Sequence, residues 1–118
     1  MSVKHALENP LRDIDRIVLP PASFLHEQEK VTKRLPAAIR YIEQNKLNEH
    51  FGPDKASIGL VCQGGMYNAV IRALQRLGLA DLYGNTQIPL YVLNVTYPLV
   101  DNEVLNFVQD KDSVLLIE

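Results

Sequence analysis

Short apolar segments alternate with helix-like segments along the second half of the chain. The apolar segments cover residues 56–62, 89–95 and 113–117, and amphipathic stretches at 67–77 and 101–108 separate them. Short, mostly apolar strands that alternate with helices are typical of a parallel sheet with right-handed crossover connections. The sequence therefore predicts a three-layer α/β fold in which these three strands are all parallel.

The stretch at 67–77 shows the most regular helical pattern in the chain. Its apolar residues recur at intervals of three and four, which places them on one face of a helix: Tyr67, Val70, Ile71, Leu74 and Leu77. Gly78 is expected to end this helix in a left-handed conformation, with Leu79 as the accompanying apolar contact. In the shorter stretch, Asp101 is expected to cap a helix whose inward residues are Val104, Leu105 and Val108.

The first half of the chain reads as a lead-in followed by a long helix. Residues 1–22 are interrupted by prolines and are interpreted as a linker from a preceding domain, with a frayed terminus as the equal alternative for residues 1–12. Residues 23–118 are interpreted as the α/β domain. Its first helix is expected to begin at Ser23 as N-cap, to kink or break at Pro36 and to end at Asn45, with a further turn over 47–51. The apolar face of this helix comprises Phe24, Val31, Leu35, Ile39 and Ile42.

The strand at 113–117 is followed by a single residue, so nothing after it covers that edge. Folds usually protect an open strand edge, because its unpaired backbone groups invite pairing with another chain. We therefore expect a domain truncated after its third strand, a piece of a longer polypeptide. The open edge should pair with another chain or a second copy, or be covered by linker residues 13–22.

Composition narrows the classes of function. A net charge of −2 gives no basic field for nucleic acid or anionic lipid, and no apolar run approaches the ~20 residues of a membrane span. Cys62 is the only cysteine, so neither an internal disulfide nor an iron–sulfur cluster can form within one chain, and the cytoplasm is the expected compartment. The three histidines are isolated in sequence, so no metal ligands are assigned. No catalytic residues are assigned either.

One turn could bind a ligand. Gly64, Gly65, Met66 and Tyr67 lie where a strand meets a helix N-terminus, and glycines there let a small anion approach exposed amides. The spacing matches neither a dinucleotide site nor a P-loop, and the alternative is that the glycines permit tight packing. Tyr97 follows the next strand, at the carboxyl end where α/β sheets bind ligands, and is equally interpreted as an ordinary wall residue. Cys62 is interpreted as a buried strand residue rather than a reactive thiol.

The ordered set of motifs over residues 15–118 resembles a known family. These motifs are Gly64-Gly65, Tyr67, Ala73-Leu74, Tyr97-Pro98-Leu99 and the aliphatic run from Val114 to Glu118, preceded by Leu19-Pro20-Pro21-Ala22. They resemble the middle domain of the thiamine-diphosphate-dependent 2-oxoacid:ferredoxin oxidoreductases, in the indolepyruvate:ferredoxin oxidoreductase branch. The resemblance implies a fold like the C-terminal domain of transketolase.

The resemblance also implies a reaction for the intact enzyme, the oxidative decarboxylation of arylpyruvates to acyl-CoA. Thiamine diphosphate, Mg²⁺ and iron–sulfur clusters would serve as cofactors, with CoA and ferredoxin as partners. This chain has no Gly-Asp-Gly and no cluster cysteines. It is therefore expected to bind none of these cofactors and to act as a scaffolding and interface domain, contacting other domains or subunits in a homo-oligomer. The alternative function is a free-standing α/β module that binds a small anion.

Overall fold

The computed structural model describes residues 19–118, and the chain divides into two units, Met1–Pro36 and Ala37–Glu118. The predictions for residues 1–12 and most of those for the linker fall outside the described residues. No helix within residues 19–118 is long and apolar enough to cross a membrane.

Helical structure runs through the described part of the first unit. Helix α2 (Ala22–Glu29) continues into a π-helical turn, η2 (Lys30–Arg34), and α3 (Leu35–Asn45) begins one residue before Pro36. Proline has no amide hydrogen to donate to the carbonyl four residues earlier, and its ring crowds that carbonyl. The wider π turn before Pro36 accommodates both the missing hydrogen bond and the ring. The change from π-helix to α-helix falls just before Pro36, near the predicted interruption, and the predicted end at Asn45 is confirmed.

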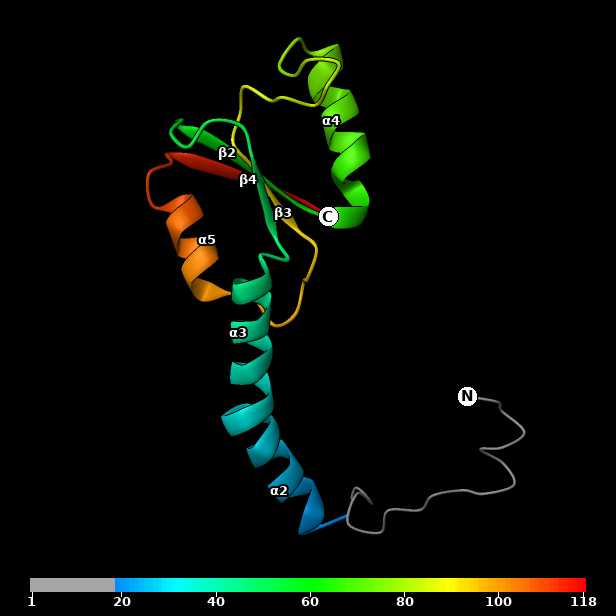
Figure 1. Ribbon diagram of the computed structural model, residues 1–118, viewed down its shortest axis with the longest axis vertical. Coiled ribbons are helices and arrows are strands. Elements are labelled where there is room, and N and C mark those ends of the chain that lie inside the picture. Colours follow the sequence, from blue (N-terminus) through cyan, green and yellow to red (C-terminus); the bar gives the residue numbers. More distant parts are fainter. Residues whose placement is uncertain (1–18) are drawn as a thin grey trace, which may run out of the picture. The chain divides into compact units, whose positions relative to one another are not determined.

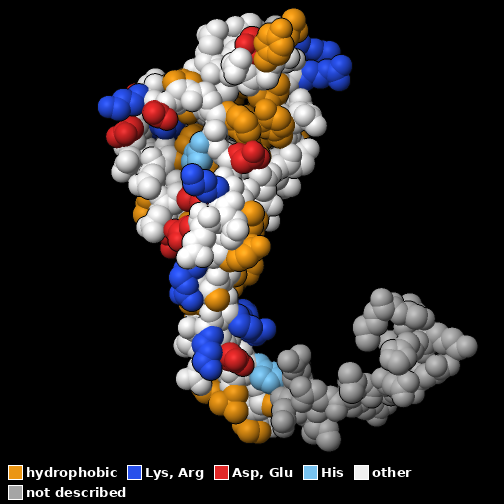
Figure 2. Space-filling model, viewed as in Figure 1, with side chains coloured by type: hydrophobic (Ala, Val, Ile, Leu, Met, Phe, Trp, Pro, Cys, Tyr) orange, Lys and Arg blue, Asp and Glu red, His pale blue; other side chains and the backbone are white. Residues whose placement is uncertain are grey.

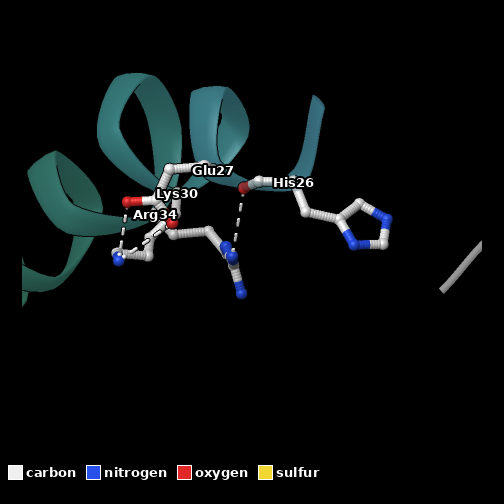
Figure 3. Close-up of polar contacts among 4 residues, drawn as sticks. All are labelled: His26, Glu27, Lys30 and Arg34. Atoms are coloured by element: carbon white, nitrogen blue, oxygen red, sulfur yellow. Dashed lines mark hydrogen bonds and ion pairs between the residues drawn. The ribbon is translucent and has the colours of Figure 1, made fainter. Parts of the chain in front are cut away.

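Local polar contacts support this helical turn (Figure 3). Lys30 Nζ lies 2.8 Å from Glu27 Oε1, and the Arg34 guanidinium donates a hydrogen bond of 3.4 Å to the backbone carbonyl of His26. The expected apolar face is buried only in its second half. Phe24 and Val31 are exposed, whereas Ile42 is buried.

The second unit contains a four-stranded sheet in the order β1-β3-β2-β4 (Figure 1). Its strands are β1 (Glu49–Phe51), β2 (Ile58–Gln63), β3 (Leu90–Leu93) and β4 (Ser113–Ile117). The pairs β2–β3 and β2–β4 are parallel, which confirms the prediction for the three apolar strands, and the α/β fold class with them. As expected, β4 is an edge strand.

Strand β1 overturns the prediction of a helical turn over residues 47–51. It pairs antiparallel with β3, with Glu49 opposite Val92 and Phe51 opposite Leu90. Leu47 and Phe51 lie four residues apart, a spacing that also fits a helix. Pairing with β3, a contact made far along the chain, decides the outcome instead.

The helices lie on opposite faces of the sheet (Figure 1). A short 3₁₀ turn, η3 (Gly64–Met66), leads into α4 (Tyr67–Arg76), and α5 (Asp101–Val108) precedes β4. Helix α4 packs on alternate residues of β2 and β3 to form one core cluster: Leu60, Cys62, Val70, Ile71, Leu74, Leu90 and Val92. On the other face, Phe107 of α5 packs on Val61 and Tyr91.

Helices α3 and α4 are each followed by a residue in the left-handed conformation. Gly78 has a φ of 71°, and the amide of Leu79 bonds to the carbonyl of Leu74, so the predicted cap of α4 is confirmed. Lys46 takes the same role after α3, with a φ of 49° and the amide of Leu47 bonded to the carbonyl of Ile42. A lysine there adopts a backbone conformation that glycine adopts more easily.

Three side-chain predictions are wrong. Ser23 lies inside α2, whose N-cap is Pro21, and Asp101 is the first residue of α5 rather than its cap. Neither helix has a side-chain cap hydrogen bond at its N-cap. Leu105 does not face inward as predicted, because it is 60% exposed. Phe107 is the buried residue of this helix instead. Val104 and Val108 do pack toward the core, as predicted.

Candidate functional site

The predicted ligand-binding turn lies at the carboxyl ends of two neighbouring parallel strands. Gln63 ends β2 and lies opposite Leu93, the last residue of β3. The segments that leave these strands, Gly64–Met66 and the loop after Leu93, therefore begin at the same edge of the sheet. This is the edge at which open α/β sheets commonly bind ligands.

Gly64 is held closely against the loop that follows β3. A Cβ atom at this position would collide with the side-chain oxygen of Asn94, whereas a Cβ at Gly65 would meet nothing within 4 Å. The Asn94 amide nitrogen in turn donates hydrogen bonds of 2.9 Å to the carbonyl of Leu47 and to Glu49 Oε2. Gly64 therefore has a packing role, the alternative that the sequence left open.

Met66 and Tyr67 also have structural contacts. Both are half-buried and pack on the core cluster beneath α4, and the Tyr67 ring lies 5.1 Å from that of Phe51. The backbone amide of Tyr67 already donates to the carbonyl of Gly64. Gly65 is thus the exposed, open position of the turn.

Tyr97 lies in the loop after β3 and its side chain is 69% exposed. Within residues 19–118, no side-chain hydrogen bond or ring contact joins Tyr97 to the glycine turn. The four turn residues are consecutive in the chain, and the structure shows no contact of these kinds that would join Tyr97 to them. Cys62 is fully buried in the core, as expected, and burial raises the pKa of its thiol, which disfavours the reactive thiolate.

A buried polar cluster that sequence reasoning missed joins β3, α5 and the segment before β1. The Asn48 side-chain amide donates to Tyr91 Oη at 3.2 Å and to Glu103 Oε2 at 2.9 Å. Tyr91 donates its hydroxyl hydrogen to the same carboxylate oxygen at 2.8 Å. Asn48 Oδ1 accepts from the amide of Val95 at 3.1 Å. Burial and the Glu103 carboxylate both raise the pKa of Tyr91, so its phenol stays protonated.

His50 of β1 covers the outer side of this cluster. Its ring is stacked on Tyr91, with centroids 4.4 Å apart and planes 8° apart. Burial lowers the pKa of His50, the Glu103 carboxylate raises it, and the Lys111 ammonium lowers it. Lys111 itself lies over the Phe107 ring, 4.3 Å from its centroid.

A cavity of about 340 Å³ opens beside His50 and Glu103. Its wall includes Phe107 and Lys111, and a second hollow of about 330 Å³ shares His50 and Glu103. One signal in the sequence could have indicated this region. Tyr91 interrupts an aliphatic strand, and a buried hydroxyl needs a hydrogen-bond partner. Its partners Asn48 and Glu103 are 43 and 12 residues away, and no short motif connects them.

Comparison with known proteins finds two similar sequences, and both have the same protein name. The chain is 28% identical over 105 residues to "Indolepyruvate oxidoreductase subunit IorA" of Methanothermobacter marburgensis, which covers 88% of this chain and 16% of that protein. It is 29% identical over 108 residues to the subunit of the same name from Methanothermobacter thermautotrophicus, covering 91% of this chain and 16% of that protein. No family model matches the chain, and no solved structure matches it.

These similarities extend over nearly the whole described fold but only a small part of the relatives. The chain spans 16% of the length of the curated relatives that it matches. Its sequence, which forms a mostly parallel sheet with α4 and α5 on opposite faces, is similar to one limited stretch of an indolepyruvate oxidoreductase subunit.

Proposed function

We propose that this chain corresponds to an interface domain of an indolepyruvate oxidoreductase. The observation that carries the proposal is its similarity to IorA over 88–91% of the chain. In this proposal, residues 1–22 are a linker and residues 23–118 are an α/β domain of the transketolase C-terminal type.

The intact enzyme would oxidatively decarboxylate an arylpyruvate and form an acyl-CoA. Thiamine diphosphate would supply the carbanion chemistry, and iron–sulfur clusters would carry the electrons to ferredoxin. Other domains or subunits of the same oxidoreductase would be the direct partners of this chain in the cytoplasm, within a homo-oligomer.

The residues of this chain do not fit those cofactors. A cluster needs about four thiolates, and the chain offers only Cys62, which is fully buried. The sequence lacks the Gly-Asp-Gly of the family's diphosphate site, and no three acidic, histidine or cysteine side chains within residues 19–118 are grouped to hold a metal ion. No catalytic step is therefore assigned to this chain, and its role in the proposal is structural.

The surface of β4 supports an interface role. Val114, Leu115 and Leu116 are 39%, 57% and 56% exposed, and the outer edge of the strand pairs with no other strand of residues 19–118. Apolar side chains on both faces of an open edge strand favour association with further protein.

The activity of the purified chain tests the structural role. The chain is mixed with Mg²⁺, thiamine diphosphate, indolepyruvate, CoA and a viologen dye, and calorimetry measures cofactor binding separately. We expect no dye reduction and no binding of thiamine diphosphate tighter than about millimolar. Cofactor-dependent dye reduction, or tighter binding, would contradict a purely structural role.

A further inference from the structure

An apolar groove of about 380 Å³ runs between α4 and β4. Ala69 and Ala73 of α4, with Leu77 just after its end, form one side, and Leu115 and Ile117 of β4 form the floor. Leu77 is 71% exposed and Leu115 is 57% exposed, so their apolar surface is largely in contact with solvent.

The dimensions of the sheet indicate what fits this groove. A helix is about 10 Å wide and neighbouring strands are about 4.8 Å apart, so one helix covers about two strands. Helix α4 covers β2 and β3, as its core contacts show, and β4 lies beside them. No helix of residues 19–118 covers β4 on this face, so the strip over β4 has room for one more helix, alongside α4. Alanines at positions 69 and 73 allow such a helix to approach α4 closely.

The charge on the rim of this groove indicates what kind of helix would fit it. Arg72 and Arg76 line a hollow that shares Ala69, Ala73 and Leu77 with the groove. Figure 2 shows Lys and Arg side chains beside hydrophobic ones around α4. Within residues 19–118, the ion pairs are formed by Lys30 and Lys33, so both arginines lack a carboxylate partner there. A second copy of α4 laid along the groove would bring four guanidinium groups together, which disfavours self-association through this surface.

We propose that the α4–β4 groove is a docking site for an amphipathic helix that carries carboxylates along one edge. Its apolar face would cover Leu115, Ile117 and the alanines, and its carboxylates would pair with Arg72 and Arg76. The identity of this helix rests on the proposed function. The helix would belong to the part of the indolepyruvate oxidoreductase subunit outside the matched stretch.

Peptide binding tests this proposal. Synthetic peptides of about 20 residues, long enough for several helical turns, tile the Methanothermobacter marburgensis IorA sequence outside the matched 105 residues. Fluorescence anisotropy measures the binding of each peptide to the 118-residue chain. We expect binding by a peptide with an apolar helical face and an acidic edge, weakening as salt is raised.

Variants of exposed residues assign the binding to the groove. The double change Arg72→Glu and Arg76→Glu, and separately Leu115→Lys, should each weaken binding at least about tenfold. Arg40→Glu, an exposed charge reversal on α3, is the matched control and should leave binding unchanged.

Three results would overturn the proposal. The first is that no peptide binds, and the second is that the groove variants bind as tightly as the unchanged chain. The third is a dimer in sedimentation that Leu115→Lys dissociates, which would place a second copy in the groove. The proposed function is tested independently, because an active chimera of this chain with IorA together with an absence of peptide binding would reject the groove alone.

Discussion

Asn48 Nδ2 lies 2.9 Å from Glu103 Oε2, although 55 residues of sequence separate the two. This contact ties the segment before β1 to α5, and Tyr91 between them donates to the same carboxylate. Asn48 is 5% exposed, so its polar atoms depend on these partners rather than on water.

Replacing Asn48 with alanine should destabilise the fold more than replacing Tyr91 with phenylalanine. Asn48→Ala removes three hydrogen bonds and leaves the Val95 amide without its acceptor, at a cost of about 2–3 kcal/mol. Tyr91→Phe leaves the Asn48–Glu103 bond in place and should cost about 1 kcal/mol. Urea unfolding monitored by circular dichroism measures both, and equal losses of stability would contradict a larger contribution from Asn48 than from the Tyr91 hydroxyl.

The charges around His50 make its protonation depend on two neighbours in opposite directions. Glu103→Gln should lower the pKa of His50 further, because it removes a charge that favours the imidazolium. Lys111→Met should raise it, because it removes a charge that opposes the imidazolium. Titration of the imidazole by NMR measures both changes, and shifts of the same sign in the two variants would contradict this electrostatic arrangement.

The lowered pKa of His50 also sets the direction of a pH effect on stability. Below the unfolded pKa of about 6.5, the unfolded chain binds a proton that the folded chain takes up only at lower pH. The contribution of His50 is therefore fully present above about pH 6.5 and decreases as the pH falls toward its folded pKa. His50→Gln should flatten the stability profile in this window, and an unchanged slope would argue against it.

The two glycines of the predicted ligand turn should respond differently to alanine. Gly64→Ala places a methyl group against the Asn94 side chain and should cost about 1–3 kcal/mol. Gly65→Ala is the matched control and should change stability by less than about 0.5 kcal/mol, because space is open there. If the turn also binds an anion, titration with phosphate will shift the amide resonances of residues 64–67. Shifts found only elsewhere would reject that site.

The left-handed residue after α3 offers a stabilising change. Lys46→Gly should raise the free energy of unfolding by about 0.5–1 kcal/mol, because glycine adopts a positive φ without a Cβ clash. Arg40→Gly within α3 should lower it by about the same amount, since glycine weakens a helix interior. Thermal and urea unfolding compare the pair, and destabilisation by both would show that position 46 is not strained.

The sequence predicts the parts of this fold that depend on local patterning. Periodicity identified β2, β3, β4, α4 and the Gly78 cap, because each follows from neighbouring residues. Strand β1 and the place of Asn48 in its cluster could not be predicted this way, since β1 pairs with the distant strand β3 and Asn48 bonds to Tyr91, 43 positions further along the chain. For the candidate site, the sequence placed the glycine turn correctly at a strand end. Only the structure shows that Gly64 is held there by Asn94.

A chimeric subunit tests the central claim most directly. This chain replaces the matched 105 residues in the IorA subunit of Methanothermobacter marburgensis, and indolepyruvate-dependent dye reduction is measured beside an otherwise identical subunit lacking the stretch. If this chain is an interface domain of the enzyme, the chimera regains the activity that the deletion loses. Asn48→Ala within the chimera then lowers the yield of assembled enzyme. A well-folded chimera that neither assembles nor reduces the dye would contradict the proposed function.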